Sequence, residues 1–208
     1  MSRVNGFRPG TFCLILCTFA FFFLASCLDV RTDFRLYRDG RVRADLEYSI
    51  TPEAAEFGRG FGSDEPWFLP LTEKDFRQQA LRHPETRILR YRTSTDSDGI
   101  EHVSVRLDSQ SVDALGSYLG LELKLEGDPR AGTLTLAMPA DAGGNADPES
   151  LNRLSPFMDG VSFSFRFRPP SRPQTVSMGE IDGREAVFSI SLTQLFQPGF
   201  AEDWVVTW

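Results

Sequence analysis

The side chains best suited to nucleophilic, acid–base or metal chemistry are scarce in this sequence of 208 residues. Its cysteines are Cys13, Cys17 and Cys27, and its histidines are His83 and His102. A thiolate can act as a nucleophile, as a metal ligand or as the sulfur of a thioether, and all three thiols lie within the first 27 residues. Two imidazoles without a nearby thiol argue against a zinc site. We therefore expect no metal and no cofactor.

A serine hydrolase would need a serine, one of these histidines and a carboxylate to meet in space. The segment Gly116-Ser117-Tyr118-Leu119-Gly120 lacks the spacing of a nucleophile elbow. Carboxylates are plentiful, but they fall in turns and on the polar faces of the expected strands, as solvated side chains do. We therefore expect no enzyme. A hydrolase remains a third hypothesis, and it requires His83 or His102 in a cleft beside Ser, Asp or Glu.

Two further segments have part of the spacing of a ligand-binding loop. Asp96-Ser97-Asp98-Gly99 is spaced like a calcium loop, but Val105 stands where the bidentate glutamate is needed. Gly58-Arg59-Gly60-Phe61-Gly62 lacks the GK[ST] ending of a phosphate loop. The first segment is therefore predicted to be a turn, and the second carries no phosphate site.

The first 26 residues predict a secretory signal peptide. Arg3 and Arg8 precede an apolar run from Thr11 to Ala25, which ends in small residues. This run is short for a membrane span, which needs about 20 apolar residues. The alternatives are a retained transmembrane anchor and a signal peptide that is cleaved without lipidation.

The end of the run, Leu24-Ala25-Ser26-Cys27, resembles the lipobox of bacterial lipoproteins. The resemblance implies cleavage before Cys27, a diacylglycerol thioether on its sulfur and often a further acyl chain such as palmitate on its amino group. More than one chain is needed for stable attachment to a bilayer. The resemblance implies a lipid-anchored protein of the cell envelope, on a periplasmic or surface face. Leu28, where Asp would signal retention in the inner membrane, favours the outer membrane.

Residues 27–208 are expected to form a single globular α+β domain, because their number suits one sizeable core. The full chain has a formal net charge of −7, and loss of Arg3 and Arg8 with the signal makes the remainder more acidic. An acidic domain argues against nucleic acid as a partner, since such binding needs a basic surface. Acylation of Cys27 would leave no thiol for a disulfide.

The expected fold is a mostly antiparallel β-sheet built from hairpins, with two or three short helices. Apolar and polar residues alternate on both sides of turn signals in the hairpins expected at 30–50, 86–108 and 121–138. In the second hairpin, Leu89 and Tyr91 are expected on the buried face. Further strands are expected at 161–167, 174–179, 184–190 and 204–208, the second and third of these forming a meander around Asp182-Gly183. Helices are expected at 73–82 after Thr72, from Ser109 or Ser111 to Tyr118, after Thr51, at 148–157 and at 191–196.

Two groups of side chains are candidates for membrane or ligand contact. Phe57, Phe61, Trp67 and Phe68 lie in an irregular glycine-containing segment that could dip into lipid or cover a pocket; alternatively, these rings fold back on the sheet. Arginines recur over 77–92 and 166–172, and Arg166 and Arg168 are the chosen candidates for contact with anionic headgroups. The alternative for the arginines is a solvated face paired with Asp and Glu.

The order of elements also carries a resemblance. A hairpin directly after Cys27, a helix, further hairpins and the alternating segment 160–167 are similar to uncharacterised spirochaete-type lipoproteins and, more distantly, to the LppM-type lipoprotein domain of mycobacteria. The second likeness implies an α+β domain that binds lipid glycans. The leading hypothesis is a non-enzymatic lipoprotein that binds an envelope component or a protein partner at the membrane surface. The alternative is a lipid or glycolipid carrier with an apolar cavity.

Overall fold

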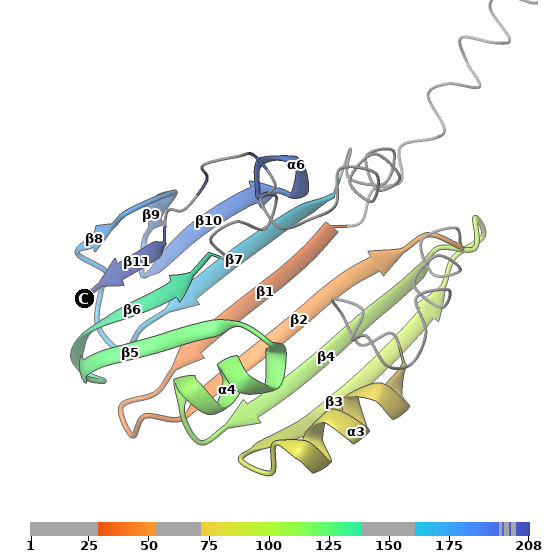
Figure 1. The fold of residues 1–208 in the computed structure, drawn as a ribbon, viewed down its shortest axis with the longest axis horizontal. Helices are drawn as coiled ribbons and strands as arrows, with labels where there is room; N and C mark the ends of the chain where they lie inside the picture. Colours follow the sequence, from red (N-terminus) through yellow and green to blue (C-terminus); the bar gives the residue numbers. More distant parts are fainter. Residues whose placement is uncertain (1–28, 53–71, 139–160, 196, 198–199, 201–202) are drawn as a thin grey trace, which may run out of the picture.

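The computed structural model describes residues 29–52, 72–138, 161–195, 197, 200 and 203–208. Two β-sheets form most of this part of the chain (Figure 1). The larger sheet has seven strands in the order β3-β4-β2-β1-β7-β10-β9, and the smaller has four in the order β5-β6-β11-β8. The fold class is therefore α+β, as the sequence predicts.

The elements have the following bounds. The larger sheet contains β1 (Asp29–Leu36), β2 (Val42–Ile50), β3 (Thr86–Thr95), β4 (Glu101–Ser109), β7 (Ser162–Arg168), β9 (Glu180–Asp182) and β10 (Glu185–Ser191). The smaller sheet contains β5 (Glu122–Asp128), β6 (Ala131–Ala137), β8 (Thr175–Val176) and β11 (Trp204–Thr207). The described helices are α3 (Glu73–Arg82), α4 (Val112–Leu119) and α6 (Leu192–Leu195).

The three predicted hairpins are confirmed as β1–β2, β3–β4 and β5–β6. Their turns use residues that reverse an antiparallel chain at low cost. Gly40 and Gly99 have φ of 86° and 81°, in the left-handed region that favours glycine. The Asp96–Gly99 segment is thus a hairpin turn, as predicted.

Side-chain caps set the starts of the helices. Thr72 Oγ1 accepts a hydrogen bond from the Asp75 N–H, and the Asp75 carboxylate accepts one from the Thr72 N–H, which makes a capping box. Ser111, rather than Ser109, caps α4, and Gly120 ends that helix in the left-handed region. Ser191 caps α6 as predicted. The helix expected at 148–157 and all but the start of the one after Thr51 lie outside the described residues.

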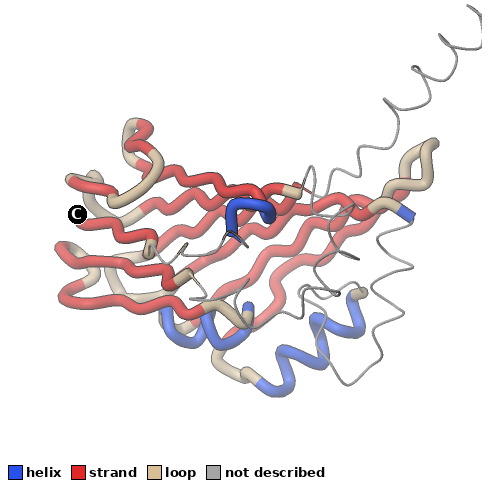
Figure 2. The backbone as a smooth tube through the Cα atoms, turned by 45° about the horizontal axis from the view of Figure 1, so that its top comes forward, coloured by secondary structure: helices blue, strands red, loops and turns tan. Residues whose placement is uncertain are grey.

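One face of the larger sheet holds the core. Figures 1 and 2 show α3, α4 and the smaller sheet on this side of it. Aromatic rings join the two sheets: the Trp204 ring centroid lies 6.3 Å from that of Phe165 and 5.8 Å from that of Phe188. Phe167 and Trp208 meet edge to face at 5.3 Å. No described helix has the length and apolar character needed to span a membrane.

The central pairing of the larger sheet is parallel. β1 runs beside β7, with Val30 opposite Phe163 and Phe34 opposite Phe167, whereas the other strand pairs are antiparallel. The sequence analysis did not anticipate this pairing, which joins segments more than a hundred residues apart and leaves no local signal. It places the first described strand in the middle of the sheet.

Two expectations about strands are wrong. Leu89 is 43% exposed, because a β-bulge between Ile88 and Arg90 shifts the register and turns Ile88 toward the core in its place. The meander around Asp182-Gly183 is instead a hairpin of β9 and β10, while β8 pairs with β11 in the other sheet. The stretch expected at 174–179 thus contributes only Thr175–Val176 to a sheet, the smaller one, and β9 begins after it at Glu180.

Candidate functional site

The second face of the larger sheet is polar, and no described helix or strand covers it. We call this the open face. Cross-strand register places four kinds of side chain on it: arginine, carboxylate, serine and histidine. Its residues include Arg31, Asp33, Arg35, Arg43, Asp45, Glu47, Ser49, Arg87, Arg90, Arg92, His102, Ser104, Arg106, Asp108, Ser164, Arg166, Arg168 and Ser189.

Many arginines of the open face are neutralised by carboxylates. Arg106 Nε donates to Asp45 at 2.6 Å, and Arg87 donates to the buried Asp108 carboxylate at 2.8 Å. The hydrogen bond to Asp45 raises the pKa of the Arg106 guanidinium above its ordinary value. Of the arginines in the 77–92 cluster, Arg87 is thus paired with an acid, as the alternative interpretation expects.

Arg166 and Arg168 also lie on the open face. Arg166 donates to Glu185 at 2.7 Å and lies 3.7 Å from Asp33, and the bond to Glu185 raises the pKa of its guanidinium. Arg168 lies 3.7 Å from the same Glu185 carboxylate. Their contact with headgroups stays a prediction, and the geometry adds that an anion would have to compete with Glu185.

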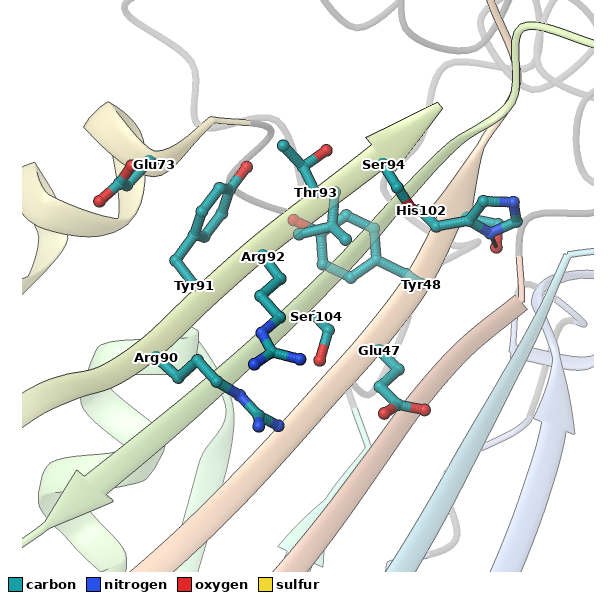
Figure 3. A pocket seen from close by; sticks show the side chains of 12 residues that line it. Glu47, Tyr48, Glu73, Arg90, Tyr91, Arg92, Thr93, Ser94, His102 and Ser104 are labelled. Carbon is teal, nitrogen blue, oxygen red and sulfur yellow. Dashed lines mark hydrogen bonds between the residues drawn. The ribbon is translucent and has the colours of Figure 1, made fainter. Parts of the chain in front are cut away.

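Arg90 and Arg92 differ from their neighbours. Within the described residues, neither forms an ion pair or a hydrogen bond to a side chain, and the Arg90 Nε atom is buried without a hydrogen-bond partner. Both line a hollow of about 840 Å³ at the β3, β4 and β2 strands (Figure 3). The Arg43 Nε atom, on the same face, is likewise buried without a hydrogen-bond partner, but Arg43 lies 3.8 Å from Asp108. What sets Arg90 and Arg92 apart is therefore the lack of an ion pair within the described residues, which leaves their terminal N–H groups available to an external acceptor.

The lining of the hollow is mixed. Figure 3 shows the Arg90 and Arg92 side chains extending from β3 over β4, with Glu47 nearby. Glu47 forms no ion pair with either arginine in the described structure. The full lining is Glu47, Tyr48, Ser49, Glu73, Arg90, Tyr91, Arg92, Thr93, Ser94, His102, Val103 and Ser104.

The two tyrosines of the lining point to the core side. Burial raises the pKa of the Tyr48 hydroxyl and also that of Tyr91. Both hydroxyls therefore stay protonated at neutral pH and act as neutral polar groups. Capping of α3 by Thr72 positions Glu73, which lies with these tyrosines on the core side of the sheet, so the lining of the hollow extends from the open face round the edge strand β3.

At one end of the hollow a serine, a histidine and an aspartate form a chain of hydrogen bonds. Ser49 Oγ lies 2.8 Å from His102 Nδ1, and His102 Nε2 lies 3.2 Å from Asp96 Oδ2. The residues come from β2, from β4 and from the β3–β4 turn. Sequence reasoning named His102 as a candidate but not its partners, because Ser49 is 53 residues away and no local motif marks it.

The other imidazole has a different setting. His83 follows the last residue of α3, where its backbone N–H caps the helix, and its ring meets the edge of Tyr118 at 6.2 Å. It does not line the hollow. Of the two histidines, His102 therefore meets the requirement stated for a hydrolase.

Several sequence-predicted residues lie outside the described part of the chain. These are the lipidation candidate Cys27 and the aromatic group Phe57, Phe61, Trp67 and Phe68. Among the described residues, no group of three His, Cys, Asp or Glu side chains could hold a metal ion.

Comparisons with known proteins give a structural likeness but no likeness in sequence. No protein-family model matches the sequence, and no curated protein matches it. Among solved structures, the fold is similar to the folded domain of LppM from Mycobacterium tuberculosis, determined by NMR, with a TM-score of 0.45 and 14% sequence identity. The likeness covers 99% of this chain and 94% of that one. At this TM-score it assigns neither a family nor a function to the chain.

Proposed function

We propose that this protein is a lipid-anchored lipoprotein of the bacterial envelope whose open face binds an anionic group of an envelope component at the membrane surface. The observation that carries the proposal is the pair of arginines at the hollow. Arg90 and Arg92 have no carboxylate partner in the described structure, whereas Arg87 on the same strand has one. A guanidinium is a good donor to phosphate or carboxylate oxygens.

The position of β1 supports a membrane-facing site. β1 begins at Asp29, two residues after Cys27, so a lipid on that cysteine would have a tether of under about 10 Å. The hollow lies toward the same end of the sheet, because Ser49 follows Tyr48, the partner of Val30 near the start of β1. An anchored domain would therefore present the hollow close to the headgroups. Leu28 favours the outer membrane as the location.

The carrier alternative has less support. A carrier needs an apolar cavity of several hundred Å³, and the natural place for one is the space between the two sheets. In the described structure Phe34, Phe165, Phe188 and Trp204 stack there with centroid separations of 5.8 to 6.3 Å. These rings fill the position that a lipid chain would need.

The proposal is tested by anion binding to the lipidated protein held in phosphatidylcholine nanodiscs, with inorganic pyrophosphate as the probe in isothermal titration calorimetry. Arg90→Gln and Arg92→Gln should each weaken binding about fivefold, which corresponds to about 1 kcal/mol. Arg87→Gln is the matched control: it has the same charge change on the same strand, but its guanidinium is already held by Asp108. Equal losses in all three variants, or no pyrophosphate binding at all, would contradict the proposal.

A further inference from the structure

The Ser49–His102–Asp96 chain of hydrogen bonds has the connectivity of a nucleophile, a base and an orienting carboxylate. In such a triad the middle imidazole accepts the serine proton on one nitrogen and donates to the carboxylate from the other. Here Nδ1 faces the Ser49 hydroxyl at 2.8 Å and Nε2 faces Asp96 at 3.2 Å. The roles of the three side chains depend on the order of their hydrogen bonds, and either ring nitrogen of the imidazole can face the serine.

Asp96 is held in position by its own turn. Its Oδ1 accepts hydrogen bonds from the backbone N–H groups of Asp98 at 2.9 Å and Ile100 at 3.0 Å, which leaves Oδ2 directed at His102. Desolvation acts to raise the pKa of Asp96, but these hydrogen bonds and the one from His102 outweigh it and lower the pKa. Asp96 is therefore an anion at neutral pH. An anion at this position favours the imidazole form that carries its proton on Nε2 and its lone pair toward Ser49.

The surroundings supply room and positive charge. Ser49 and His102 both line the hollow that contains Arg90 and Arg92. Arg92 pairs with Ser104 in the β3–β4 register, next to the pair formed by Ser94 and His102. Diagonal neighbours on one sheet face lie about 7–8 Å apart at Cα, within reach of a long side chain. Arg92 is thus a diagonal neighbour of His102, and Figure 3 shows its guanidinium beside Ser104 and directed away from the imidazole, so it supplies positive charge to the hollow rather than at Ser49 itself.

We propose that Ser49 is the nucleophile of an esterase site, with His102 as general base and Asp96 as positioning residue. This activity goes beyond the binding function proposed above. The substrate class is a carboxylic ester with a nearby anionic group, as in the headgroup region of an anionic lipid. The ester fits because the site lies at the end of the sheet where β1 begins, and the anionic group fits because Arg90 and Arg92 lack partners in the described structure.

The chemistry balances with water as the second substrate. The Ser49 oxygen attacks the ester carbonyl carbon while its proton moves to His102, and the ester C–O bond breaks as His102 gives that proton to the leaving alkoxide. The products of this half are an alcohol and an acylated Ser49. Water then attacks the acyl carbon with His102 again as base, and a carboxylic acid and free Ser49 are released.

The test uses the full chain purified in a non-ionic detergent and a fluorophosphonate probe. Reaction forms a bond from Ser49 oxygen to phosphorus and expels fluoride, and mass spectrometry of the peptides locates the adduct. We expect labelling at Ser49, loss of the adduct in Ser49→Ala and at least a hundredfold slower labelling in His102→Gln. Ser189→Ala is the matched control, since Ser189 lies on the same face and is hydrogen-bonded to Ser164, away from any histidine.

The role of Asp96 needs a readout that separates orientation from folding. With p-nitrophenyl butyrate as substrate, Asp96→Asn should lower kcat at least tenfold and leave KM unchanged. The thermal unfolding midpoints of Asp96→Asn and His102→Gln should both stay within a few degrees of the parent. The proposal would be overturned if no adduct formed on Ser49, or if His102→Gln left the rate of Ser49 labelling unchanged. Arg90→Gln need not affect labelling, so failure of anion binding and failure of the esterase are distinguishable.

Discussion

At the scale of single residues, the polar groups inside the described core have defined partners. The Tyr118 hydroxyl donates to the carbonyl of Phe76 at 2.9 Å, and Gln79 donates to the carbonyl of Tyr118 at 3.1 Å. Burial raises the pKa of the Tyr118 hydroxyl, so it remains a donor at all physiological pH values. This pair of bonds links α3 to α4.

Replacing Tyr118 with Phe should lower the free energy of unfolding by about 1 kcal/mol, the usual contribution of one buried hydrogen bond. Urea denaturation followed by tryptophan fluorescence measures the change. Tyr37→Phe is the control, because it removes the same hydroxyl from a ring that packs among Arg35, Arg41 and Arg43 and has no hydroxyl bond in the described structure. If both variants lose equal stability, the Tyr118 bond contributes nothing specific.

The Asp96 carboxylate should titrate below its ordinary pKa of 3.8. A lowered pKa in the folded protein means that the ionised carboxylate stabilises the turn above the ordinary pKa and that this contribution is lost as pH falls through the folded value. Carboxyl-carbon NMR across this range measures the pKa, and His102→Gln should raise it by removing one donor. A pKa at or above 3.8 in the parent protein would contradict the described hydrogen bonds.

The site shows where prediction from sequence ends at this scale. The turn at Asp96 could be predicted because glycine and aspartate favour it locally. The meeting of Ser49 with His102 could not, because it depends on the β2–β4 register, which places these two residues opposite one another. Nor does composition distinguish Arg90 and Arg92 from Arg87, since only the fold decides which guanidinium receives a carboxylate.

At the scale of elements, local patterns predict most of the strands and long-range pairing decides their arrangement. Alternation and turn chemistry are sufficient for the three hairpins, and Thr72 and Ser111 are sufficient for the starts of α3 and α4. The division into two sheets depends on contacts between distant segments, such as β11 with β6. The bulge after Ile88 is also a product of pairing, so Leu89 could not be placed from alternation alone.

Close backbone packing strongly favours glycine at position 179, directly before β9. Gly179 has φ of 77°, and a Cβ there would overlap the Val187 carbonyl oxygen and come within 3.0 Å of Phe188 Cα. Gly179→Ala should therefore cost about 2–3 kcal/mol of unfolding free energy, measured by chemical denaturation.

Gly183 provides the comparison for that experiment. Its φ is 60°, but nothing lies within 4 Å of the position of a Cβ. Gly183→Ala should cost only about 1 kcal/mol, from the left-handed backbone alone. A loss at Gly179 no larger than that at Gly183 would show that the backbone around Val187 can move aside.

At the scale of the whole molecule, the proposed lipid anchor connects to the sheet through very little chain. The signal and Cys27 lie outside the described residues, while β1 begins at Asp29. If Cys27 is acylated as proposed, Cys27→Ser should release the protein from sedimented envelopes and abolish metabolic labelling with palmitate. A Cys27→Ser variant that still sediments fully and is still labelled would contradict acylation of Cys27, and with it the proposed position of the open face at the membrane surface.

The central place of β1 has a mechanical consequence. β1 is hydrogen-bonded to β2 on one side and to β7 on the other along most of its length. A pull on a tether at its first residue acts along the strand axis, so many backbone bonds on both flanks would share the load at once rather than open one by one. A drag on the body would then detach the acyl chains from the leaflet before it unravelled the strand.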